Sequence, residues 1–173
     1  MSDAIRVGLV GFGYASKTFH APLIGGTPGM ALKAVASSDA DKVHADWPGV
    51  KVMSAPGDLL DDPDIDLVVI ATPNDTHFPL AKAALEAGKH VVVDKPFTVT
   101  LSQARELESL AKHCGRILSV FHNRRWDSDF LTVKALINEG TLGEIAFFES
   151  HFDRYRPQVR DRWREQAGPG SGI

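Results

Sequence analysis

The 173-residue sequence predicts an α/β fold, a doubly wound and mostly parallel sheet with helices on both of its faces. Three observations support this prediction. Short apolar runs alternate with helical patterns from Ile5 to Phe121, the runs are continuous, and the first of them ends in a glycine turn. Continuous apolar runs are typical of strands that are buried on both faces, as in a parallel sheet.

Six short runs of aliphatic and β-branched residues are the expected strands: Ile5–Val10, Leu32–Ala36, Val50–Met53, Leu67–Ala71, Val91–Val93 and Ile117–Phe121. A first helix is expected over Ala15–Ile24, directly after the glycine turn. The order of strand and helix then repeats along the chain, which favours the doubly wound arrangement.

Two further helices carry clear end signals. Apolar residues recur at helical spacing from Phe78 to Leu85, and Gly88 supplies the stop. Thr100 and Gln103 form a capping-box pattern ahead of the next helix, which Gly115 ends.

The pattern changes after residue 123, so residues 1–123 are expected to form one domain and residues 124–173 the beginning of a second. Residues Trp126–Glu139 predict an amphipathic helix, and Ile145–Tyr155 predicts a long strand rich in aromatic and charged residues. Because such a strand has no partner in the sequence that follows, we expect a truncated α+β domain. The apolar residues expected to face inward from this helix are Phe130, Val133, Leu136 and Ile137.

The composition limits the classes of function. Hydrophobic residues make up 43% and charged residues 24%, with a formal charge of −3, which disfavours a nucleic-acid partner. The single cysteine, Cys114, excludes an internal disulfide and is read as a small semi-buried hydrophobe. No run is long enough to span a membrane, so we expect a cytoplasmic protein, and no histidine pair has metal-ligand spacing, so no metal is expected.

The first strand runs into Gly11-Phe12-Gly13, and a helix follows. This is the setting of a dinucleotide-binding turn, in which Gly11 makes the bend and Gly13 lets the backbone approach a pyrophosphate. Phe12 and Tyr14, the neighbours of Gly13, are counted among the candidate cofactor-binding residues. The third glycine of the G-x-G-x-x-G pattern is replaced by Ser16, which is small enough to preserve close helix–strand packing. An incidental tight turn is the alternative.

The end of the second strand predicts which dinucleotide binds. An acidic residue there would accept hydrogen bonds from the adenosine ribose and select NAD. The sequence has Ser37 and Ser38 instead, so we favour NADP over NAD, although no arginine is present to clamp the 2′-phosphate. In the alternative interpretation, Ser37 and Ser38 start a turn and Asp39 caps a helix.

Residues 90–98, "HVVVDKPFT", place Asp94, Lys95 and Pro96 directly after a buried strand. Ligands bind at the carboxyl ends of parallel strands, where a desolvated lysine can share or relay a proton. We expect Pro96 to fix the direction of Lys95, with a cis peptide bond between the two residues. A solubilising charge at the end of a strand is the alternative reading of Lys95.

Three segments together resemble one family: "GFGYASKTFHAPLI", "ATPNDTHFPLAKAALEAGKHVVVDKP" and "FHNRRWDSDF". They are similar to the glucose–fructose oxidoreductase, inositol dehydrogenase and MocA (Gfo/Idh/MocA) family, in order and at matching separations. The resemblance implies a Rossmann domain that binds NAD(P), and hydride transfer to or from a sugar, a polyol or a related compound. It also implies a small-molecule substrate and a homo-oligomer at full length.

The resemblance assigns roles to individual residues. Lys95 is the catalytic residue and reaches both the nicotinamide ribose and the reacting hydroxyl; Asp94 replaces the usual glutamate beside it. The loop expected beneath the nicotinamide consists of Thr72, Pro73, Asn74 and His77. Asn74 can alternatively serve as a helix N-cap, and His77 as a capping or surface residue.

The segment Asn123, Arg124 and Arg125 matches the family's basic segment, in which one side chain contacts cofactor or substrate and another forms an interdomain ion pair. The family's D-x-x-x-H helix is expected just after "GPGSGI", so we expect this chain alone to lack turnover. A non-catalytic dinucleotide sensor of the same fold is the alternative, and the presence of Lys95 argues against it.

Overall fold

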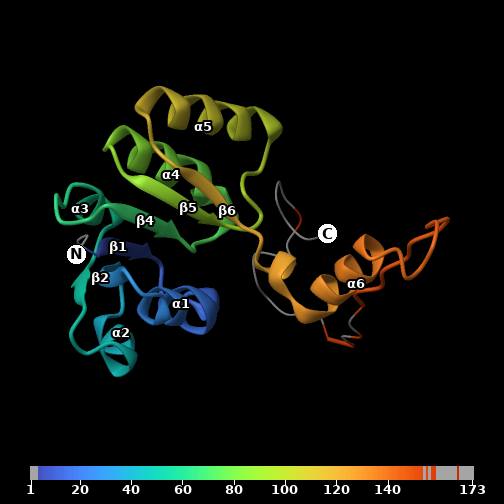
Figure 1. Ribbon diagram of the computed structural model, residues 1–173. Coiled ribbons are helices and arrows are strands. Elements are labelled where there is room, and N and C mark those ends of the chain that lie inside the picture. Colours follow the sequence, from blue (N-terminus) through green and yellow to red (C-terminus); the bar gives the residue numbers. More distant parts are fainter. Residues whose placement is uncertain (1–3, 154, 156, 159–166, 168–173) are drawn as a thin grey trace.

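The computed structural model describes residues 4–153, 155, 157, 158 and 167. Six strands form one parallel sheet in the order β3-β2-β1-β4-β5-β6, as Figure 1 shows. This order confirms the predicted doubly wound sheet. The strands are β1 (Ile5–Val10), β2 (Met30–Ala36), β3 (Lys51–Met53), β4 (Leu67–Ile70), β5 (His90–Asp94) and β6 (Leu118–Phe121).

The strand order reverses at β1, which pairs with β2 on one side and with β4 on the other. At its carboxyl end Val10 is in register with Ala36 of β2 and Ile70 of β4. The crevice outside such a reversal is where open α/β sheets bind ligands. The fold therefore places the glycine turn after β1 at the expected site.

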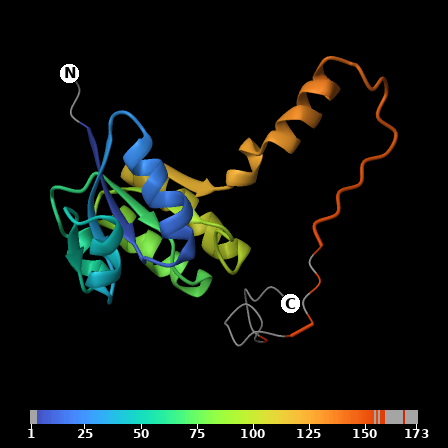
Figure 2. The same ribbon diagram turned by 90° about the horizontal axis from the view of Figure 1, so that it is seen from below.

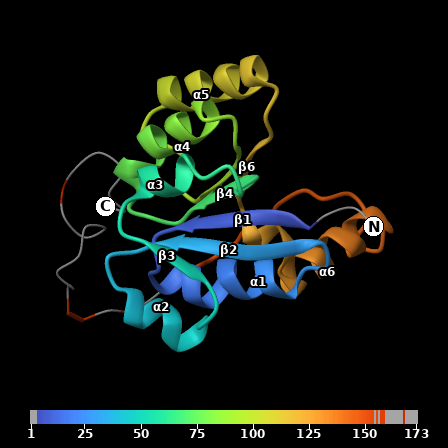
Figure 3. The ribbon, with the colours of Figure 1, turned by 90° about the vertical axis from the view of Figure 1, so that its left-hand side faces the viewer.

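Helices cover both faces of the sheet, as Figures 1 and 3 show. Three of them pack on one face, where the larger hydrophobic core includes Leu59, Leu85 and Leu107. Two pack on the other face, with Ile24 and Val43 in the second core. The first group is α3 (Pro56–Leu60), α4 (His77–Glu86) and α5 (Leu101–Cys114); the second is α1 (Ala21–Gly26) and α2 (Ala40–Asp46).

The predicted end signals of α5 are confirmed. The Gln103 N–H donates to Thr100 Oγ1 at 3.3 Å, and Gln103 Oε1 accepts from the Thr100 N–H at 3.3 Å, which completes the capping box. Gly115 ends the helix in the left-handed conformation at φ 62°.

The helix after the glycine turn is not uniformly α-helical. Ser16–His20 form the π-helical segment η1, in which the Ala21 N–H donates to Ser16 O five residues back, and α1 continues from there. The sequence did not predict this segment. The alternative in which Asp39 caps a helix is confirmed, since its Oδ1 accepts from the Lys42 N–H of α2 at 2.9 Å.

After β6 the chain leaves the sheet through the short helix η3 (Asn123–Trp126) and forms α6 (Ser128–Asn138). Figures 1 and 2 show α6 apart from the sheet and its covering helices. The expectation that its apolar side chains face inward is wrong: Phe130, Val133 and Ile137 are exposed and Leu136 is only half-buried. No element within the described residues packs over that face.

The long strand predicted over Ile145–Tyr155 is also wrong for the residues that the structure describes in it. Residues 145–153 pair with no other strand there, and Phe147, Phe148 and Phe152 are each more than two-thirds exposed. A strand needs a hydrogen-bonded neighbour, and the described residues offer none to this segment. No helix among the described residues is both long and apolar enough to cross a membrane.

Candidate functional site

The glycine turn after β1 is closed on the protein side and open on the other. Gly11 has φ +87°, and a Cβ there would lie 2.9 Å from Ala71 O, so only glycine fits. Its N–H donates to Ala36 O at 2.9 Å, which ties the turn to β2. A Cβ on Gly13 would meet nothing within 4 Å, so no protein contact requires a glycine there. An approaching ligand explains that requirement.

Ser16 takes over the structural part of the third glycine. It is fully buried, and its Oγ donates to Gly11 O at 2.8 Å. The expectation that serine preserves close packing is thereby confirmed. The Phe12 side chain is buried in the core, whereas Tyr14 is 78% exposed and makes an edge-to-face contact with Phe19. Neither the Phe12 side chain nor its ring is therefore available to a ligand.

The end of β2 presents hydroxyl groups. The Ser37 N–H donates to Met53 O, and Ser37 Oγ accepts from the Asp39 N–H at 3.1 Å. Ser38 is exposed. Because Asp39 caps α2, no carboxylate replaces the two serines at the strand end itself.

The loop between β4 and α4 is held by short hydrogen bonds. Thr72 Oγ1 lies 2.6 Å from Thr76 Oγ1, which donates to Pro73 O. Asn74 is buried and opens the 3-10 helix η2 (Asn74–Thr76). The N-cap position of α4 belongs to Thr76, so the alternative role of Asn74 as the cap residue of that helix is wrong.

His77 lies in the first turn of α4 and is 1% exposed, which contradicts the alternative of a surface histidine. Its Nδ1 is 2.8 Å from Pro96 O, and its Nε2 is 2.9 Å from Thr72 O. Both ring nitrogens therefore face backbone carbonyls of two different loops. The ring joins these loops and has no nitrogen directed at a ligand.

Lys95 follows β5, and the Lys95–Pro96 peptide bond is cis, as predicted. The side chain is exposed, and its Nζ has no hydrogen bond or ion pair with any described residue. The burial that the sequence argument invoked for this lysine is thus not provided by that part of the chain. A cavity of about 610 Å³ opens beside it, lined by Lys95, Pro96, His122, Asn123, Arg124 and Arg125.

The basic segment contributes unequally to this cavity. Arg124 Nη1 lies 2.8 Å from Asp127 Oδ2, and the hydrogen bond from this carboxylate raises the pKa of Arg124 above its usual value. Arg125 is exposed and Asn123 is half-buried. The ion pair expected in this segment is therefore local to η3 and its neighbour.

Asp94 is turned toward the protein interior. Its Oδ1 accepts from the Lys95 N–H at 2.7 Å, and its Oδ2 lies 3.6 Å from His20 Nε2. Burial acts to raise the pKa of Asp94, but the His20 ring and the Lys95 N–H outweigh it, so that the pKa lies below its usual value. Sequence reasoning missed His20, which is 4% exposed; its one signal is its place on the helix after the glycine turn.

The predicted residues fall into two groups along one edge of the sheet. Gly11, Gly13 and Ser37 follow β1 and β2, whereas Lys95 and Asn123 follow β5 and β6. Because all strands are parallel, both groups lie at the carboxyl edge. An elongated ligand across this edge would contact both groups. No cluster of three His, Cys, Asp or Glu side chains in the described part of the chain is arranged for a metal ion.

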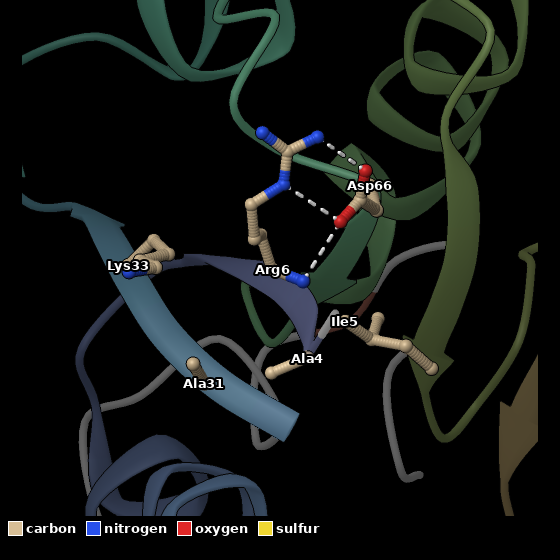
Figure 4. A pocket seen from close by; sticks show the side chains of 6 residues that line it. All are labelled: Ala4, Ile5, Arg6, Ala31, Lys33 and Asp66. Carbon is tan, nitrogen blue, oxygen red and sulfur yellow. Dashed lines mark hydrogen bonds and ion pairs between the residues drawn. The ribbon is translucent and has the colours of Figure 1, made fainter. Parts of the chain in front are cut away.

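A second hollow of about 500 Å³ lies at the opposite, amino edge of the sheet (Figure 4). Its wall is made by Arg6, whose guanidinium binds Asp66 Oδ1 at 2.7 Å and Oδ2 at 2.9 Å, and by Lys33. The Arg6 N–H also donates to Asp66 Oδ2. The charges on this wall are spent on one another, so the hollow is a poor candidate for a binding site.

Comparison with known proteins agrees with this geometry. Residues 5–122 match the model of the Gfo/Idh/MocA oxidoreductase family, described as an NAD-binding Rossmann fold, and residues 130–173 match that family's C-terminal domain. The chain is 78% identical over its whole length to the uncharacterized oxidoreductase YdgJ of Escherichia coli, of which it covers 50%. It is 40% identical over 171 residues to the NADP(+)-dependent scyllo-inositol 2-dehydrogenase IolW of Bacillus subtilis, covering 48% of it.

Solved structures give the same answer. The YPO2259 protein of Yersinia pestis superposes with a TM-score of 0.91 and 70% identity over 95% of this chain and 47% of that one. A Synechocystis biliverdin reductase solved with biliverdin and NADP+ superposes with a TM-score of 0.71 at 35% identity, over 81% of this chain and 44% of that one. The chain spans about half the length of these relatives.

Proposed function

Because this chain belongs to the Gfo/Idh/MocA oxidoreductase family, we propose that it forms the NAD(P)-binding part of an enzyme that transfers hydride to or from a small hydroxyl or carbonyl compound. The observation that carries the proposal is the carboxyl edge of the sheet, where an open glycine turn and an unpaired lysine follow strands of one parallel sheet. We place the domain boundary near residue 123, where the chain leaves the sheet.

The residues present fit a dinucleotide. The open space at Gly13 accommodates a pyrophosphate, and the backbone N–H groups at the start of the following helix donate to its oxygens. Ser37 and Ser38 face the adenosine ribose. The loop from Thr72 to Asn74 supports the nicotinamide half, with Asn123 and Arg124 on its other side.

Lys95 is the residue that handles a proton in this proposal. A bound nicotinamide supplies the chemistry of accepting or donating a hydride. As hydride leaves a hydroxyl-bearing carbon, the Lys95 amine accepts or hydrogen-bonds the hydroxyl proton at Nζ; in the reverse direction it donates one. Its lack of a protein partner leaves Nζ free for that contact.

We favour NADP over NAD. The end of β2 presents Ser37 and Ser38, which donate hydrogen bonds to a 2′-phosphate and do not repel it. Two relatives have NADP in their names or titles, IolW and the Synechocystis biliverdin reductase. IolW and a Rhodococcus jostii inositol 2-dehydrogenase also favour a polyol substrate, and the longer protein is proposed to be a homo-oligomer.

A fluorescence titration of the chain with NADPH and with NADH, side by side, tests the proposal. We expect tighter binding of NADPH, and no steady hydride transfer to a sugar by this chain alone. In a Ser37→Asp variant the added carboxylate should reverse the preference, since it repels the 2′-phosphate and accepts from the ribose hydroxyls.

Ser54→Asp provides the control, because it adds the same charge at an exposed position just after β3. It should leave the preference unchanged. Tighter binding of NADH by the unmodified chain would overturn the serine argument and keep the oxidoreductase. Binding of neither nucleotide would contradict the proposed function itself.

A further inference from the structure

Two buried histidines reach the turn that carries Lys95, one from each face of the sheet. His20 belongs to η1, next to α1 on one face, and His77 begins α4 on the other. They are 4% and 1% exposed. We call His20 and His77 the histidine brace.

His77 fixes the residue after Lys95. Its Nδ1 lies 2.8 Å from Pro96 O and its Nε2 lies 2.9 Å from Thr72 O. Carbonyl oxygens only accept hydrogen bonds, and a neutral imidazole has one N–H to donate. The singly protonated ring therefore holds one loop by a hydrogen bond, whereas the doubly protonated ring holds both.

His20 fixes the residue before Lys95. Its ring packs on Phe121 with centroids 4.3 Å apart, which sets its orientation. Its Nε2 is buried without a hydrogen-bond partner among the described residues, and the nearest carboxylate atom is Asp94 Oδ2 at 3.6 Å. A buried polar atom without a partner is costly and calls for an explanation. A small inward movement of Asp94 would complete a hydrogen bond.

Asp94 transmits this position to Lys95, because its other oxygen accepts from the Lys95 N–H at 2.7 Å. The backbone of Lys95 is thus held by its two neighbours, while its amine remains unpaired within the described residues. Nothing else among the printed contacts of this turn holds it. A group that must meet a reacting atom gains most from such preorganisation.

We propose that the histidine brace positions Lys95, with His20 acting through Asp94 and His77 acting through the Pro96 carbonyl. The inference rests on the proposed function, in which Lys95 contacts the nicotinamide ribose. His20 and His77 are positioning residues, since neither ring is directed at the ligand. This reassigns His77 from a cofactor contact to a support of the lysine.

Substitutions that keep one nitrogen of a histidine separate positioning from general stability. Asparagine retains a donor near Nδ1, and glutamine retains one near Nε2. His77→Asn therefore keeps the bond to Pro96 O, whereas His77→Gln keeps only the bond to Thr72 O. For the second histidine, His20→Gln keeps a donor that faces Asp94, and His20→Leu removes it.

The readout is the NMR signal of the Lys95 side chain in the full chain labelled with ¹³C-lysine, assigned with Lys95→Arg, during titration with NADPH. Folding is followed by the thermal midpoint, and His113→Gln on the exposed surface of α5 is the matched control. In the unmodified chain and in the control, NADPH should shift the Lys95 signal. His77→Asn and His20→Gln should retain at least half of that shift.

His77→Gln and His20→Leu should lose most of the shift and weaken NADPH binding about fivefold to tenfold, the effect of one lost hydrogen bond. If all four variants fold and show the full shift, the proposal is overturned and the oxidoreductase assignment stands. Equal losses in His77→Asn and His77→Gln would also overturn it, since a merely structural histidine predicts that result. If the unmodified chain does not bind NADPH, the proposed function fails, and the brace with it.

Discussion

The two edges of the sheet use their charged side chains in opposite ways. At the amino edge Arg6 is bound by Asp66 and Asp64, and the buried Lys89 amine donates to two backbone carbonyls at 2.7 and 2.9 Å. At the carboxyl edge the Lys95 amine has no such partner within the described chain, and Gly13 borders open space. Both edges have a hollow of similar size, about 500 and 610 Å³.

The difference between the edges shows that volume alone does not identify a site. Paired charges at the amino edge add stability to the fold and leave little to offer a ligand. Unpaired groups at the carboxyl edge cost stability or leave it unused, and they are free to bind. Substitutions at the first edge should therefore change stability, and substitutions at the second should change binding.

The largest effect is expected for Gly13→Val. Its side chain would occupy the space left for the pyrophosphate, and Gly13 has no positive φ, so the fold should tolerate it. We expect the Kd for NADPH to rise about a hundredfold, or ~2.7 kcal/mol, with an unchanged thermal midpoint. Fluorescence titration measures the first and circular dichroism the second. Gly26→Val, also open to solvent, is the control, and unchanged binding by Gly13→Val would erase the contrast.

A smaller effect, of the opposite kind, is expected for Arg6→Met. The substitution removes the hydrogen bonds to Asp66 and Asp64 at a half-exposed position. The free energy of unfolding should fall by about 1–2 kcal/mol, while the Kd for NADPH stays within about twofold. Urea denaturation provides the stability value. A large loss of NADPH affinity in a folded variant would show that the amino edge takes part in binding.

The smallest effect concerns acid stability. Hydrogen bonds from the Arg6 side chain and backbone lower the pKa of Asp66 to about 2. A carboxylate whose pKa is lowered in the folded state stabilises the fold above its unfolded pKa of about 3.9, and that contribution is lost as the pH falls toward about 2. Unfolding measured at several values in this range should show a shallower acid loss for Asp66→Asn. Asp58→Asn on exposed α3 should behave like the unmodified chain, and identical profiles for all three would refute the assignment.

Most of the sheet was predictable because strands buried on both faces must be apolar throughout. The runs around Val68 and Val91 have that character, and both are fully buried. The capping box at Thr100 and the glycine at Gly115 were predictable because each acts on its own local backbone. The short helices α2 and α3 were largely missed, since a helix of two turns carries little periodicity.

The candidate site was only partly predictable. Gly11, Gly13 and Lys95 have local signals, a turn and a strand end, and the structure places them at one edge. The burial of His20 and His77 depends on contacts with Asp94 and Pro96, which lie 74 and 19 positions away in the chain. The strand predicted over residues 145–155 failed for the same reason, since pairing is a property of two segments.

The π-helical segment η1 determines the direction of one of these histidines. A π turn holds one residue more than an α turn, and each residue of an α-helix advances the side chain by about 100° around the axis. If one residue between Ser16 and His20 were deleted, an ordinary α-helix would result, and His20 would either turn away from Asp94 or force all of α1 to rotate. The extra residue is thus a phase adjustment, which lets one helix present Gly13 to the cofactor and His20 to the strand that carries Lys95.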